Sequence, residues 1–89
     1  MKKCLLIVDV QNDFLPGGAL AVAGGDDVVE VINRMMAEFD LVVATQDWHP
    51  EGHGSFAVSH DGVSEYEVGM LGDLEQCFWP EHCVAGTEG

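Results

Sequence analysis

The sequence predicts an α/β fold built on a parallel β-sheet. Three features lead to this prediction: an apolar run at residues 4–8, a second at residues 41–46, and a segment of helical periodicity between them. Strand, helix and strand joined by short links form a βαβ unit, whose crossover is right-handed. Hydrophobic residues make up 47% of the 89 residues. This share is ordinary for a globular protein and argues against intrinsic disorder.

The first predicted strand, residues 4–8, reads CLLIV and is apolar on both faces. Such runs are typical of strands that are buried on both sides of a parallel sheet. Asp9 follows directly, at the carboxyl end of the strand, where ligands bind in open α/β sheets. From its position alone, Asp9 could cap the following turn or act as a general base. Cys4 opens the strand, and we expect it to be buried and unreactive.

The predicted helix begins at Asp26 or Asp27, either of which can serve as the N-cap. Apolar residues recur after it at spacings of three and four, at Val28, Val29, Val31, Ile32, Met35, Met36 and Phe39. This spacing predicts an amphipathic helix of about three to four turns.

The second predicted strand, residues 41–46, reads LVVATQ and again ends at an acid, Asp47. Asp9 and Asp47 should therefore lie along the same edge of the sheet. Residues 48–89 show no strong helix or strand pattern, but they are rich in glycine, histidine and aromatic residues. We expect them to form packed functional loops, since loops longer than about 12 to 15 residues in compact domains are usually functional or disordered.

The loop that leaves the second strand, TQDWHPEGHGSFA, holds the strongest candidate site. It places Asp47, His49 and His53 within seven positions, and His82 in FWPEHCV is a plausible fourth donor. A single histidine more often forms hydrogen bonds than binds metal, but several donors on one loop favour a metal site. Imidazole and carboxylate donors without thiolate suit zinc, iron(II) or manganese. We expect His60, in a polar stretch, to be solvated.

Two aromatic residues near these positions could enclose a flat substrate. Phe14 lies five residues after Asp9, and Trp79 lies three residues before His82. Either of them, taken alone, more often serves in core packing. Cys83 is adjacent to His82, but neighbouring residues in an extended segment point in different directions, so we do not assign it as a nucleophile.

The formal net charge of −13 comes from 16 acidic and 3 basic residues. Repulsion from phosphates and anionic lipids disfavours nucleic acid and membrane partners. No stretch approaches the roughly 20 apolar residues of a membrane span, and the start MKKCLLIVDV has too short an apolar run for a signal peptide. The odd number of cysteines, three, predicts free thiols in a reducing cytoplasm.

Three segments, IVDVQNDFLPGGALAV, ATQDWHPEGHGSFA and FWPEHCVAGTEG, resemble in this order the bacterial nicotinamidases (pyrazinamidases) among the isochorismatase-like cysteine hydrolases. The resemblance runs over essentially the whole chain. It implies the N-terminal portion of a three-layer α/β/α fold with a parallel sheet. Residues 1–89 would be a partial domain, with a βαβ unit at 1–47, metal- and substrate-binding loops at 48–89, and the C-terminal half absent.

The resemblance also implies a role for each candidate residue. Asp9 matches the acid/base that activates a cysteine thiol, and Phe14 and Trp79 match residues that sandwich the substrate ring. The remaining four candidates match the ligands of one divalent ion, zinc in the first place with iron or manganese as alternatives: Asp47, His49, His53 and His82.

The reaction implied by the resemblance is hydrolysis of nicotinamide, or of a pyrazinamide-like amide, to the acid and ammonia through a cysteine thioester, as in NAD salvage. The family's catalytic lysine, nucleophilic cysteine and oxyanion-hole donors would lie in the absent half. We therefore expect the isolated chain to be inactive, and marginally stable unless a second polypeptide completes the fold. The resemblance is also compatible with a homo-oligomer. The alternatives are a non-catalytic metal- or ligand-binding remnant and a related small-amide hydrolase.

Overall fold

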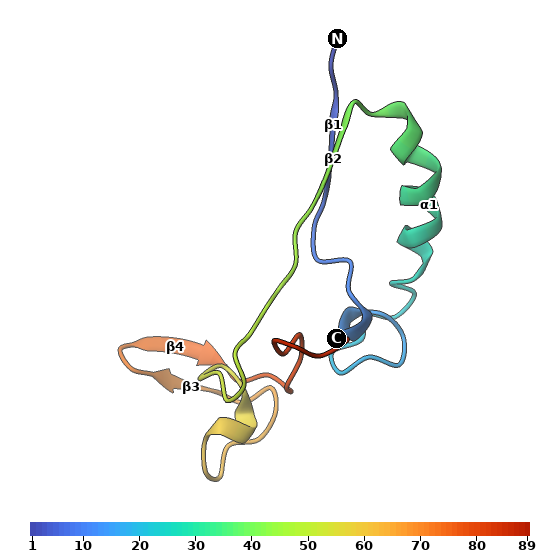
Figure 1. Cartoon of the computed structure of the whole chain (residues 1–89). Coiled ribbons are helices and arrows are strands. Elements are labelled where there is room, and N and C mark those ends of the chain that lie inside the picture. The colour runs from blue at the N-terminus through green and yellow to red at the C-terminus, as the bar shows by residue number, and fades with distance from the viewer. The chain divides into compact units, whose positions relative to one another are not determined.

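The computed structural model describes all 89 residues, which form two compact units, Met1–Asp47 and Trp48–Gly89. Their elements are traced in Figure 1. The first unit holds three regular elements and two 3₁₀ turns: β1 (Cys4–Ile7), a turn at Asn12–Phe14, α1 (Asp27–Met35), a turn at Met36–Glu38, and β2 (Leu41–Ala44). The second unit holds a 3₁₀ turn and two strands: Ala57–Ser59, β3 (Val68–Leu71) and β4 (Leu74–Cys77).

β1 and β2 pair in parallel, with Cys4 opposite Leu41 and Ile7 opposite Ala44. The crossover between them carries α1, so the predicted α/β fold with a parallel sheet is confirmed. Both strands are shorter than the apolar runs that predicted them. Shortly after β1, Asp9 adopts a φ of 54°, in the left-handed region, which is incompatible with continuing a strand.

α1 is also shorter than predicted, since its nine residues make about two and a half turns. The helical path tightens into the 3₁₀ turn after Met35. Asp27 and Glu30 in the first turn and Arg34 in the last turn complement the helix dipole. Neither helix nor turn approaches membrane-spanning size: no helix is long and apolar enough to cross a bilayer.

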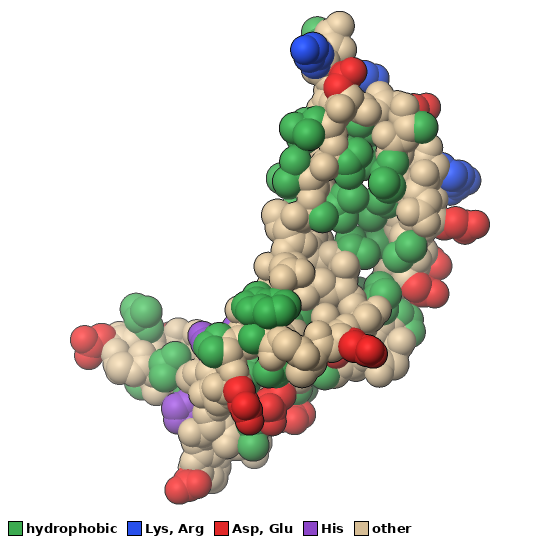
Figure 2. Space-filling view, viewed as in Figure 1, with side chains coloured by type: hydrophobic (Ala, Val, Ile, Leu, Met, Phe, Trp, Pro, Cys, Tyr) green, Lys and Arg blue, Asp and Glu red, His purple; other side chains and the backbone are tan.

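The first unit contains no fully buried side chain. Figure 2 shows hydrophobic side chains gathered on it between the strands and α1, where they are open to solvent. All four residues of β2 are exposed, including Leu41 at 57%. The prediction that Cys4 is buried is therefore wrong: Cys4 is exposed, and it stands in a two-stranded sheet whose residues are all exposed or half-buried.

β3 and β4 form an antiparallel hairpin, with Val68 opposite Cys77 and Leu71 opposite Leu74. The expectation that residues 48–89 lack regular structure is therefore wrong for this part. The two-residue connection, Gly72 and Asp73, is a hairpin signal that the sequence does carry. It is easily missed because strands of four residues, VGML and LEQC, are too short to show a clear alternation of apolar and polar residues.

All buried residues belong to the second unit: Ser55, Phe56, Ala57, Phe78, Pro80, His82 and Cys83. Backbone hydrogen bonds join its loops around this core. Ala57 N–H donates to Trp79 O at 2.9 Å, and Trp79 N–H donates to Ser55 O at 2.9 Å. The packing is tight at Gly69, where a Cβ atom would lie 2.9 Å from the ring of Phe78. The second unit is therefore the better packed of the two.

Candidate metal and substrate site

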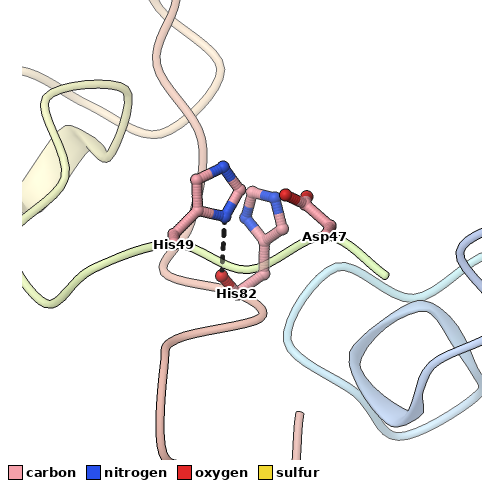
Figure 3. Close-up of side chains that lie close together, drawn as sticks. All are labelled: Asp47, His49 and His82. Carbon is pink, nitrogen blue, oxygen red and sulfur yellow. Dashed lines mark hydrogen bonds between the residues drawn. The ribbon is translucent and has the colours of Figure 1, made fainter. Parts of the chain in front are cut away.

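Asp47, His49 and His82 each offer one ligand atom, and these three atoms lie within 4.8 Å of one another (Figure 3). Asp47 is the last residue of the first unit, and only Trp48 separates it from His49. His82 comes from a segment far along the chain. His49 N–H donates to Cys83 O at 2.8 Å, which holds the loop after β2 against the segment that carries His82.

Gln11 fixes the backbone of Asp47 within the first unit. Its side-chain amide donates to Asp47 O at 2.9 Å, and its side-chain oxygen accepts from Asp47 N–H at 2.7 Å. This double contact ties the end of the second strand segment to the loop after β1. Sequence reasoning missed Gln11, and the only signal was an amide side chain two residues after Asp9 in the motif DVQND.

In both His49 and His82, the ring nitrogen Nδ1 faces a backbone carbonyl oxygen. Nδ1 of His82 is 2.8 Å from Pro80 O, and Nδ1 of His49 is 3.3 Å from His82 O. A carbonyl oxygen only accepts hydrogen bonds, so each ring carries its proton on Nδ1 and keeps the lone pair on Nε2. Metal-binding histidines in proteins are commonly oriented in this way.

Phe56 forms the apolar floor of this region. Its side chain is fully buried, and its ring centroid lies 5.2 Å from that of His49, 5.8 Å from that of His53 and 5.5 Å from that of His82. His82 is itself only 5% exposed. A rigid apolar floor limits the movement of the imidazole rings and excludes water from one side of the site.

The three grouped residues fit a divalent first-row metal ion. Two neutral imidazoles and one carboxylate are donors that zinc, iron(II) and manganese accept. Three protein ligands also match the number found in zinc sites that keep a position open for water or substrate. The buried ring of His82, with its proton directed at a backbone carbonyl, is preorganised for such an ion.

The other two histidines lie outside this group. The ring centroid of His53 is 4.8 Å from that of His49, but its Nδ1 is engaged by Ser55 at 2.8 Å from the hydroxyl. The expectation that His60 is solvated is wrong. His60 is half-buried, its Nε2 is 2.8 Å from Gly54 O, and its ring packs edge-on against Phe78.

Asp9 and Phe14 lie in the first unit, where both line a pocket of about 220 Å³ whose other walls are apolar side chains and Gly25. Asp9 is held there by Thr45, whose hydroxyl donates to Asp9 Oδ1 at 3.4 Å and accepts from Asp9 N–H at 3.3 Å. Trp79 belongs to the second unit, where it is half-buried and its ring packs edge-on against that of Tyr66.

No family model matches the chain. Among curated proteins it is 53% identical to the nicotinamidase of Escherichia coli (strain K12) over 91 residues, which is 98% of this chain and 42% of that protein. The chain spans about two fifths of the length of the curated relatives that it matches.

Solved structures give the same result. A nicotinamidase/pyrazinamidase of Acinetobacter baumanii matches with a TM-score of 0.88 and 48% identity, over 96% of this chain and 41% of that one. The pyrazinamidase of Pyrococcus horikoshii in complex with zinc matches with a TM-score of 0.67 and 40% identity, over 100% of this chain and 43% of that one.

The fold and these likenesses define an isochorismatase-like α/β protein in which Asp47, His49 and His82 bring three metal-ligand atoms together. Within that class the chain is similar to the nicotinamidases, and it matches an N-terminal α/β portion of their structures. The family resemblance predicted from the three sequence motifs is therefore confirmed.

Proposed function

We propose that this chain provides the metal-binding and substrate-binding portion of an amide hydrolase that converts nicotinamide and water to nicotinate and ammonia. The observation that carries the proposal is the grouping of Asp47, His49 and His82 within 4.8 Å, in a chain 53% identical to a nicotinamidase. A pyrazinamide-like amide is the closest alternative substrate, because one matching structure is a pyrazinamidase.

The three grouped residues would hold one divalent ion. Zinc is the first choice, because the Pyrococcus horikoshii structure is a zinc complex, and iron or manganese would suit the same donors. When bound, the ion supplies an electrophilic anchor for a lone-pair atom of the substrate. His49 and His82 would each supply one ring nitrogen, and the buried ring of Phe56 packs edge-on against both imidazoles.

Asp9 would act as the general base and Phe14 as a wall for the substrate ring, since both line the pocket of the first unit. The left-handed backbone of Asp9 supports a functional role, because a non-glycine residue in that region is strained and such residues cluster at active sites. Trp79 would supply the second aromatic wall, as in the family pattern.

None of the three cysteines of the chain is placed to act as the nucleophile of the proposed reaction. Cys83 is only 2% exposed, Cys4 opens β1 at the opposite end from Asp9, and the thiol of Cys77 donates to Tyr66 O. We infer that the reacting thiol and the oxyanion donors come from polypeptide outside these 89 residues. The chain by itself would then bind a metal ion without turning over an amide.

In the complete site, Asp9 would take the proton of that cysteine, and the thiolate would add to the carboxamide carbon. Collapse of the adduct breaks the C–N bond, and Asp9 returns the proton to the leaving amine, which departs as ammonia. Water then hydrolyses the thioester, releasing nicotinate and the free thiol. One amide and one water are consumed, and one acid and one ammonia are formed.

The test combines metal binding with amidase activity. Zinc titration of the 89-residue chain should give one ion per chain in the wild type and in His60→Ala, and a large loss of affinity in His49→Ala. Ammonia release from nicotinamide should be absent for the chain alone and should appear when the remaining portion of a nicotinamidase relative is added. A zinc-loaded, reassembled pair that releases no ammonia would contradict the proposed reaction.

A non-catalytic metal-binding module is the second candidate. It is favoured by one observation: His49 and His82 belong to the unit that contains every buried side chain of the chain. On this alternative the chain binds zinc tightly and stays folded, yet no added polypeptide produces amidase activity. The reassembly assay therefore separates the two candidates.

A further inference from the structure

His53 differs from the other two histidines around Phe56 in the kind of group that faces its Nδ1. The backbone N–H of Ser55 donates to His53 Nδ1 at 3.1 Å, and the hydroxyl of Ser55 is 2.8 Å from the same nitrogen. A backbone N–H can only donate, so His53 Nδ1 must hold a lone pair. The neutral ring then carries its proton on Nε2.

This arrangement is the opposite of that at His49 and His82. Their Nδ1 atoms face carbonyl oxygens, so their lone pairs lie on Nε2. A metal ion needs a lone pair, and in His53 the only one is already used by Ser55. The groups that face Nδ1 therefore favour one tautomer in the neutral rings of His49 and His82 and the opposite tautomer in the neutral ring of His53.

The backbone around His53 is fixed as firmly as its ring. His53 N–H donates to Pro50 O at 3.1 Å, and His53 O accepts from Phe56 N–H at 3.1 Å and from the hydroxyl of Ser59 at 2.8 Å. Ser55 is only 8% exposed, so its side chain has little freedom to turn away. Changing the tautomer of His53 would place two N–H groups against each other, and the partly buried hydrogen bond from Ser55 N–H would be lost.

His53 lies beside His49, one of the three grouped metal-ligand candidates. Its ring centroid lies 4.8 Å from that of His49 and 5.8 Å from that of Phe56, so it stands beside a metal-binding candidate on the same apolar floor. His53 is half-buried and does not belong to the group formed by Asp47, His49 and His82.

We propose that His53 is not a metal ligand but a hydrogen-bond donor beside the metal site, and that Ser55 is the positioning residue that fixes its tautomer. The acceptor is a lone-pair atom of a water molecule or of the substrate held at that site. This inference deepens the proposed function and rests on it for the identity of the acceptor, whereas the tautomer itself follows from the contacts of Ser55 alone.

The tautomer can be measured directly by long-range ¹H–¹⁵N correlation spectra of the metal-free, full-length chain, at a pH where its histidines are neutral. The His53→Gln spectrum identifies the signals of His53. We expect His53 to show a protonated Nε2 and an acceptor Nδ1, and His49 and His82 to show the reverse. A protonated Nδ1 in His53 would overturn the proposal, whether or not the chain binds metal.

Zinc titration supplies the second measurement. His53→Ala should keep one zinc ion per chain with an affinity within about fivefold of wild type, while His49→Ala should weaken binding by about 100-fold or more. His60→Ala is the matched control and should behave as wild type. Equal losses in His53→Ala and His49→Ala would make His53 a ligand and refute the inference. If the wild type bound no zinc, the proposed function would fail, and the tautomer spectrum would still decide the role of His53.

Discussion

Replacing Phe56 by alanine removes the largest fully buried side chain of the protein. Substitutions of this kind cost about 3–5 kcal/mol, from lost burial and from the cavity that remains. A unit of the size of Trp48–Gly89 has a total stability of about 2–6 kcal/mol. The loss is therefore comparable with the whole stability of the unit, and we expect Phe56→Ala to leave half or more of the second unit unfolded.

Urea unfolding followed by tryptophan fluorescence measures this effect selectively, because Trp48 and Trp79 both belong to the second unit. Val58→Ala is the matched control, since Val58 lies in the same 3₁₀ turn region but is 68% exposed. Its unfolding free energy should change by less than about 0.5 kcal/mol.

Zinc should partly rescue Phe56→Ala if the three ligands still meet. Free zinc at 100 times its dissociation constant adds about 2.7 kcal/mol to the folded state, which is close to the lower limit of the expected loss. An unfolding midpoint for Phe56→Ala equal to that of Val58→Ala would refute the reasoning, because it would mean that Phe56 does not form the floor of the site.

Three further predictions concern the first unit and the thiols. Gly18→Ala should destabilise the first unit by more than about 2 kcal/mol, since the added Cβ would lie 2.3 Å from Asn12 O. Thermal melting followed by circular dichroism measures this loss, with Ala23→Ser, at an exposed position, as the control. Asp9→Gly should leave the free energy of unfolding unchanged or raise it by up to about 1 kcal/mol, because glycine accepts the φ of 54°. The same change should abolish amidase activity in the reassembled pair. A lower urea midpoint than that of the wild type would contradict the strain argument. Iodoacetamide should label Cys4 rapidly and Cys83 only on unfolding, as followed by mass spectrometry; equal rates in the native chain would contradict the burial of Cys83.

The sequence predicted β1 and β2 from two continuous apolar runs, and α1 from apolar residues that recur at helical spacing between them. The element ends were less accurate, since they depend on where the backbone turns: Asp9 leaves the extended region soon after β1, and α1 tightens after Met35. The hairpin of β3 and β4 was missed because its strands are short. The burial of Cys4 was wrong because burial depends on what covers a sheet, which an apolar run does not reveal.

For the candidate site, the sequence identified the metal-ligand types, since Asp47 and His49 lie two residues apart and the segment FWPEHCV adds His82. It did not reveal Gln11, whose importance comes from two hydrogen bonds to a residue 36 positions away. It also gave no sign that Phe56 would lie under three imidazole rings, because contacts between distant loops leave no periodic pattern.

The sequence by itself determined the α/β class, the order of the motifs, and the supply of imidazole and carboxylate donors. Only the tertiary structure decided whether Nδ1 of each histidine faces a hydrogen-bond acceptor or a donor. That choice depends on the atom that faces Nδ1 in space: a carbonyl oxygen at His49 and His82, and a backbone N–H at His53. Identical side chains therefore differ in tautomer, because a carbonyl oxygen accepts a hydrogen bond from a protonated Nδ1, whereas a backbone N–H donates to an Nδ1 that carries a lone pair.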